Sequence, residues 1–80
     1  MNRFKLATWN VNSIRIRLEL LKKLIELENP DIICLQEVKA KEEDFPFADI
    51  RAMGYPEIAL YGMAGYNGVA ILSKTPLKKP

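Results

Sequence analysis

The 80-residue sequence predicts an α/β fold made of a β-α-β unit, a short helix and a β-hairpin. Near the N-terminus, a stretch with helical spacing of apolar residues separates two short apolar segments, and the second of these is unbroken over residues 32–35. A strand, a helix and a strand in succession indicate two parallel strands. Further along, two more apolar segments flank the glycine-rich stretch GMAGYNG, and such a short connection is typical of an antiparallel hairpin.

The first predicted elements are a strand over residues 3–9 and a helix over residues 12–28. The segment RFKLATW alternates loosely between polar and apolar side chains, as a strand does. The segment IRIRLEL also alternates with a period of two and would fit a strand on its own. Because the following LLKKLIELEN fits only a helix, we expect one helix across both segments.

The predicted helix has an apolar face, a start signal and a stop signal. Its buried stripe is expected to comprise Ile14, Leu18, Leu21 and Ile25, widened by Leu20, Leu24 and Leu27. Asn12 or Ser13 can cap its start, and Asn29 followed by Pro30 ends it.

The second predicted strand covers residues 31–37, DIICLQE. Its continuous apolar run is typical of a strand that is covered on both faces of the sheet. The remaining elements are a polar loop, a short helix begun by Pro46 and stopped by Gly54, and two hairpin strands, at residues 38–45, 46–53, 57–62 and 68–74.

The composition allows one small domain and indicates no particular partner. Hydrophobic residues make up 49% of the chain and charged residues 28%, and the net charge of +2 is too small to indicate nucleic-acid binding by itself. One cysteine cannot form an internal disulfide, and without histidine a structural zinc site is not expected. A single thiol in an apolar run, no continuous apolar segment at the N-terminus and no stretch of membrane-spanning length lead us to expect a cytoplasmic protein without a membrane partner.

Polar side chains follow both strands of the predicted parallel pair. Asn10 follows the first strand, and Gln36 and Glu37 follow the second. The carboxyl ends of parallel strands meet at one edge of a sheet, so an amide oxygen and a carboxylate should converge there. Such oxygen ligands suit a hard cation such as Mg²⁺, although on residue type alone turn formation by Asn10 and a solvated Glu37 remain the commoner roles.

Three blocks of sequence, TWNVNSIRIR, PDIICLQEVK and YNGVAILSK, resemble in that order the start of the exodeoxyribonuclease III family. This family, with the abasic-site endonucleases, belongs to the endonuclease/exonuclease/phosphatase superfamily. The resemblance covers essentially the whole chain. It implies that residues 1–80 are the N-terminal fragment of a single domain and form about one side of a four-layer α/β sandwich. It also implies Mg²⁺-dependent hydrolysis of double-stranded DNA, with Mn²⁺ as an alternative metal, at abasic sites and at 3′ ends.

The resemblance assigns roles to individual residues. Glu37 and Asn10 match ligands of the divalent metal. Substrate-binding roles are implied for four others, each with an ordinary alternative: Asn12 at the rim of the site or as a helix cap, Arg15 near a DNA phosphate or on a solvated helix face, Lys39 near the site or on the surface, and Tyr66 on the DNA backbone or in packing.

The resemblance also implies that essential groups lie outside these residues. The chain contains no histidine, and no carboxylate after Glu37 stands in a catalytic motif of the family. We therefore expect no catalytic proton-transfer residue here, no activity of the chain alone, and an uncovered apolar sheet face that favours association. Two alternatives stay open: a related phosphatase or phosphodiesterase acting on phospholipid or inositol phosphate, and a non-catalytic α/β module that binds a partner through its open sheet.

Overall fold

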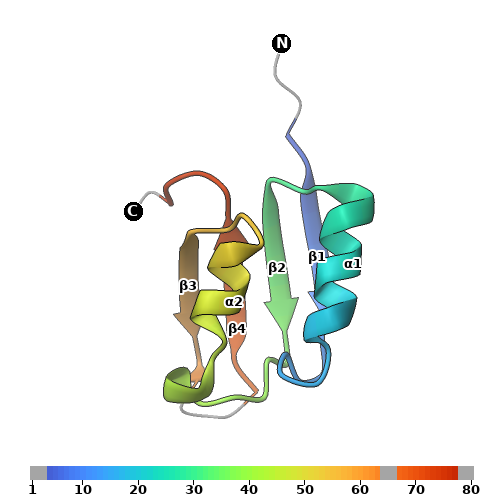
Figure 1. The fold of residues 1–80 in the computed structure, drawn as a ribbon. Coiled ribbons are helices and arrows are strands. Elements are labelled where there is room, and N and C mark those ends of the chain that lie inside the picture. The colour runs from blue at the N-terminus through green and yellow to red at the C-terminus, as the bar shows by residue number, and fades with distance from the viewer. Residues whose placement is uncertain (1–3, 64–66, 78–80) are drawn as a thin grey trace.

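A computed structural model describes residues 4–63 and 67–77 and confirms the predicted α/β fold (Figure 1). The elements in chain order are β1 (Leu6–Asn10), α1 (Leu18–Glu28), β2 (Ile32–Gln36), the short 3-10 helix η1 (Glu42–Asp44), α2 (Phe47–Ala52), β3 (Glu57–Tyr61) and β4 (Val69–Ser73). The strands form one four-stranded sheet in the order β1-β2-β4-β3. Among the described residues, neither α-helix has the length and apolar character needed to cross a bilayer.

The strand pairing matches the prediction in both halves of the sheet. β1 and β2 are parallel, with Asn10 opposite Gln36 at the end of the ladder. β3 and β4 are antiparallel neighbours and form the predicted hairpin, while β4 also pairs antiparallel with β2. Asn10 is the last residue of β1, and Glu37 comes directly after β2.

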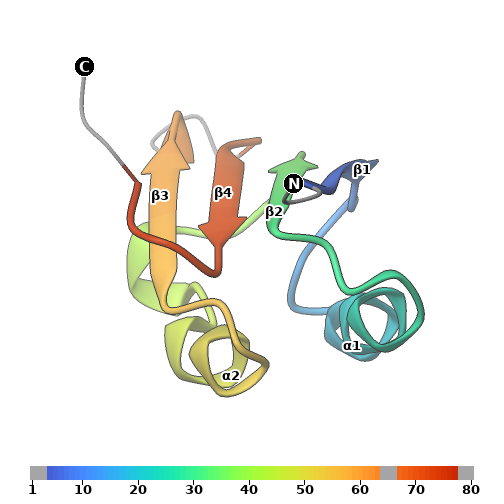
Figure 2. The ribbon, with the colours of Figure 1, turned by 90° about the horizontal axis from the view of Figure 1, so that it is seen from above.

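Both helices lie on the same face of the sheet, so among residues 4–63 and 67–77 helices cover that face only (Figure 2). Ile33 and Leu35 of β2 are fully buried under the helices, whereas Ile32 and Cys34 between them are only half-buried. The prediction that this strand is covered on both faces is therefore wrong for the chain by itself. The open face carries mostly apolar side chains, which alternate along each strand with the residues that face the helices: Leu6, Ile32, Cys34, Ala59, Tyr61, Val69 and Ile71.

Helix α1 begins at Leu18, six residues later than predicted, and the preceding residues 14–17 form a turn. Neither predicted cap is used, because Asn12 and Ser13 have positive φ angles of 46° and 86° and the residue before the helix is Arg17, which makes no side-chain capping bond. The backbone N–H of Ser13 instead donates to the carbonyl of Glu37 at 2.9 Å. A long-range hydrogen bond therefore competes successfully with the first helical turn.

The later start changes which apolar residues are buried. Leu20 and Leu27 were expected to widen the buried stripe of the helix, but they are 51% and 81% exposed. Ile14 remains fully buried from its position in the turn. The end of the helix is as predicted, because Asn29 takes the left-handed conformation (φ 45°) and donates its N–H to the carbonyl of Ile25.

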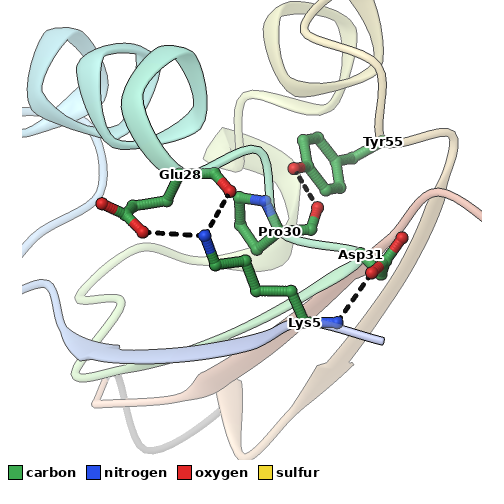
Figure 3. Close-up of polar contacts among 5 residues, drawn as sticks. All are labelled: Lys5, Glu28, Pro30, Asp31 and Tyr55. Carbon is green, nitrogen blue, oxygen red and sulfur yellow. Dashed lines mark hydrogen bonds and ion pairs between the residues drawn. The ribbon is translucent and has the colours of Figure 1, made fainter. Parts of the chain in front are cut away.

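A polar cluster fixes the amino ends of β1 and β2 (Figure 3). The backbone N–H of Lys5 donates to Asp31 Oδ2 at 2.7 Å, and Lys5 Nζ lies 2.9 Å from both the carbonyl oxygen and Oε1 of Glu28. The buried hydroxyl of Tyr55, which follows α2, donates to the carbonyl of Pro30 at 2.5 Å. These contacts tie both helices to the start of the parallel pair.

Replacing Tyr55 by Phe is expected to lower the free energy of unfolding by about 1–3 kcal/mol, because the buried carbonyl of Pro30 loses its donor. Burial, and secondly the charge of Asp31, raise the pKa of Tyr55 above 10.0. A raised folded-state pKa means that this contribution is complete below the unfolded pKa and is lost as the pH rises through the folded pKa. Urea unfolding from pH 7 to pH 11 should therefore show a difference between wild type and Tyr55→Phe that narrows on the alkaline side.

The exposed Tyr61 provides a matched control for that experiment. Tyr61→Phe should change the free energy of unfolding by less than about 0.5 kcal/mol. An equal effect of both substitutions would contradict a specific role for the hydroxyl of Tyr55.

Candidate metal centre

Asn10 and Glu37 meet at the carboxyl end of the parallel pair, as their positions in the sequence predicted. The side-chain amide nitrogen of Asn10, Nδ2, donates to Glu37 Oε2 at 2.5 Å. The register explains the contact, because Asn10 is opposite Gln36 and the next residue of the second segment is Glu37. An amide and a carboxylate from two segments are thus held together by the backbone of the sheet.

A second pair lies directly beside the first. Lys39 Nζ donates to Asn12 Oδ1 at 2.7 Å and lies 3.8 Å from Glu37 Oε1. We refer to Asn10, Asn12, Glu37 and Lys39 together as the strand-end cluster. Its members alternate with the buried residues Val11 and Val38.

The strand-end cluster exists because the two segments continue their pairing beyond the regular strands. The N–H groups of Val11, Ser13 and Ile14 donate to the carbonyls of Gln36, Glu37 and Val38, at distances between 2.9 and 3.0 Å. On the other side, the N–H of Val38 donates to the carbonyl of Gly68 at 2.9 Å, which joins the cluster segment to the start of β4. The cluster therefore rests on backbone that is hydrogen-bonded on both sides.

Unusual backbone conformations concentrate at this place. Among the described residues, five other than glycine have a positive φ, and four of them are here: Asn12, Ser13, Glu37 and Lys39. Asparagine tolerates the left-handed region, but such a conformation costs about 1–3 kcal/mol for most other side chains and is often found at functional sites. Sequence reasoning missed this feature, because no glycine marks these positions.

The donor set of the cluster fits a divalent cation that keeps other ligands as well. Glu37 is its only carboxylate, and Asn10 and Asn12 add two amide oxygens. Within residues 4–63 and 67–77 there is no group of three or more His, Cys, Asp and Glu side chains that could hold a metal alone. Mg²⁺ typically takes one or two carboxylates and completes its shell with water and substrate phosphate, so an oxygen set of this size is compatible with it.

The cluster is an open surface site. Surface cavities of about 380 and 460 Å³ lie elsewhere, one between α1 and α2 and the other between β1 and α1, and no member of the cluster lines either of them. The side chains of Glu37 and Lys39 are 43% and 35% exposed. Water and an extended ligand can therefore reach the carboxylate directly.

Of the two remaining predicted substrate-binding residues, the structure describes one and places it outside the cluster. Arg15 is exposed in the turn before α1, and no hydrogen bond or ion pair within the described part of the chain joins it to the cluster. Tyr66 lies outside the described residues. The roles implied for both by the resemblance stay predictions.

The chain is similar in sequence to a family of phosphate-ester hydrolases and to individual nucleases. Residues 7–80 match the family model described as "Endonuclease/Exonuclease/phosphatase family". Exodeoxyribonuclease III of Haemophilus influenzae is 39% identical over 70 residues, which is 88% of this chain and 26% of that protein. The chain is also 38% identical over 74 residues to an exodeoxyribonuclease of Bacillus subtilis, of which it covers 28%.

Two solved structures share the fold. An AP endonuclease from Archaeoglobus fulgidus superimposes with a TM-score of 0.80 at 44% identity, over 90% of this chain and 28% of that one. The 3′ phosphatase NExo from Neisseria, in a structure with a product DNA hairpin, gives a TM-score of 0.83 at 40% identity, over 92% and 28%. The chain thus spans roughly a quarter of the length of these proteins.

Proposed function

The chain belongs to the endonuclease/exonuclease/phosphatase family, and from that premise we propose that it is the N-terminal part of a divalent-metal-dependent DNA repair nuclease. The observation that carries the proposal is the contact of Asn10 with Glu37 at the carboxyl ends of two adjacent parallel strands. The names of the similar proteins, exodeoxyribonuclease III and AP endonuclease, support phosphodiester hydrolysis in double-stranded DNA and abasic sites as the substrate class.

The residues of the strand-end cluster have distinct roles in this proposal. Glu37 and Asn10 would hold Mg²⁺ or Mn²⁺, which when bound supplies Lewis-acid activation of the phosphate. The amide N–H of Asn10 fixes the orientation of the Glu37 carboxylate. Asn12 and Lys39, beside these two residues, are proposed to bind the substrate phosphate, and Arg15 and Tyr66 are proposed to contact the DNA backbone.

The groups that move protons are proposed to lie in the rest of the polypeptide. The chain has no histidine, and its metal-binding cluster contains one carboxylate only. The open apolar face of the sheet is where the remaining part of the same domain would pack. Without that part, residues 1–80 are expected to associate through this face and to be inactive.

The test measures cleavage of duplex DNA that contains one abasic site, with Mg²⁺ and with a chelator in its place. The complete polypeptide that carries residues 1–80 should incise the abasic strand only with the metal, while the isolated 80-residue chain should give no cleavage above background. Inositol phosphates and phospholipids are offered in parallel.

Each alternative gives a different result in this test. Hydrolysis of a lipid or inositol phosphate without cleavage of DNA would replace the nuclease by a phosphatase or phosphodiesterase of the family. No hydrolysis of any substrate by the complete polypeptide would favour a non-catalytic interaction module. Turnover by the isolated chain would contradict the claim that essential groups lie elsewhere.

A further inference from the structure

Lys39 is held in the strand-end cluster more firmly than a surface lysine needs to be. Its ammonium group donates to Asn12 Oδ1 at 2.7 Å and lies 3.8 Å from Glu37 Oε1, so it bridges the two segments. Its backbone is left-handed (φ 51°), like that of Glu37. Glu37 and Lys39 flank the buried Val38, and left-handed backbone at residues other than glycine is often found at functional sites.

The charges of the cluster cancel. Glu37 is its only anion and Lys39 its only cation. The ammonium group therefore neutralises the one carboxylate to which a divalent cation would bind. A divalent cation bound to Glu37 would be repelled by the positive charge of Lys39, since the Coulomb energy grows with the product of the charges.

We propose that Lys39 is a positioning residue whose ammonium group pairs with the Glu37 carboxylate and competes with a divalent cation for it. This inference rests on the proposed function of the cluster as a metal site. The competition lowers the affinity of the site for the metal until an anion binds. A substrate phosphate can then pair with the ammonium group of Lys39, and the Glu37 carboxylate becomes available to the metal. Binding of metal and binding of phosphate are then coupled, and each strengthens the other.

The experiment is isothermal titration calorimetry of MnCl₂ into the complete polypeptide without DNA, for wild type and Lys39→Gln. Glutamine keeps a side-chain N–H that can donate to Asn12 but removes the positive charge. The variant should bind Mn²⁺ about tenfold more tightly, because the competing charge is gone. Lys39→Arg retains the charge and should bind Mn²⁺ with the affinity of wild type.

A second part of the experiment measures the coupling between metal binding and phosphate binding. Wild type should bind Mn²⁺ more tightly when inorganic phosphate is present, and Lys39→Gln should lose most of that gain. Lys41→Gln is the matched control, because it removes the same charge two residues further along from an exposed side chain. It should leave both Mn²⁺ affinities unchanged.

The outcomes separate this inference from the proposed function. Equal or weaker Mn²⁺ binding by Lys39→Gln would overturn the counter-ion role and leave the metal site standing. No Mn²⁺ binding by wild type and both Lys39 variants would overturn the metal site itself. Loss of folding in both Lys39→Gln and Lys39→Arg would identify Lys39 as a structural residue and would also overturn the inference.

Discussion

Replacing Glu37 by Gln is expected to slow metal-dependent cleavage of abasic DNA by the complete polypeptide about a thousandfold. A metal on the phosphoryl oxygen contributes several kcal/mol to the transition state, and each ~1.4 kcal/mol is a factor of ten in rate. Glutamine can still accept the hydrogen bond from Asn10 Nδ2, so the fold of the cluster should survive. The measurement is the single-turnover cleavage rate as a function of Mg²⁺ concentration.

Glu43→Gln is the matched control for this prediction. Glu43 lies in η1 and is exposed, and it is not a member of the strand-end cluster. Removal of its charge should leave the rate unchanged. A cleavage rate of Glu37→Gln close to that of wild type, with the fold intact, would show that the carboxylate is not a metal ligand.

Replacing Ile14 by Ala is expected to lower the free energy of unfolding by about 2–5 kcal/mol, the usual cost of removing a large aliphatic side chain from a core. Ile14 is fully buried, and its N–H donates to the carbonyl of Val38 at 3.0 Å. Folded domains are stable by only about 5–15 kcal/mol, so a loss of this size should clearly lower the urea concentration at the midpoint of unfolding. Urea unfolding followed by circular dichroism measures the change.

Ile16→Ala is the control, because Ile16 has the same side chain two positions further along and is 73% exposed. It should change the free energy of unfolding by less than about 0.5 kcal/mol. Comparable losses in both variants would mean that the turn over residues 14–17 packs differently from the structure described here.

The meeting of Asn10 and Glu37 was predictable because it depends only on strand order and direction. The unbroken apolar run after a helical segment indicated a parallel pair, and parallel strands bring their carboxyl ends to one edge. The contact of Lys39 with Asn12 could not be predicted from strand order and direction. This contact occurs where Glu37 and Lys39 take left-handed backbone, for which these two residue types give no sequence signal.

Periodicity and turn residues in the sequence determined the type and order of the elements, the parallel pairing of β1 with β2 and the hairpin of β3 and β4. These features are local, since side-chain spacing reports which face of a strand or helix is apolar. The pairing of β2 with β4, which joins these two halves into one sheet, was not determined in this way. Only the tertiary structure decided where α1 begins, which face of the sheet is covered and which atoms of the strand-end cluster pair. The start of α1 and the pairing of the cluster atoms depend on hydrogen bonds between distant segments, such as that from the N–H of Ser13 to the carbonyl of Glu37, which outweigh the local helical preference.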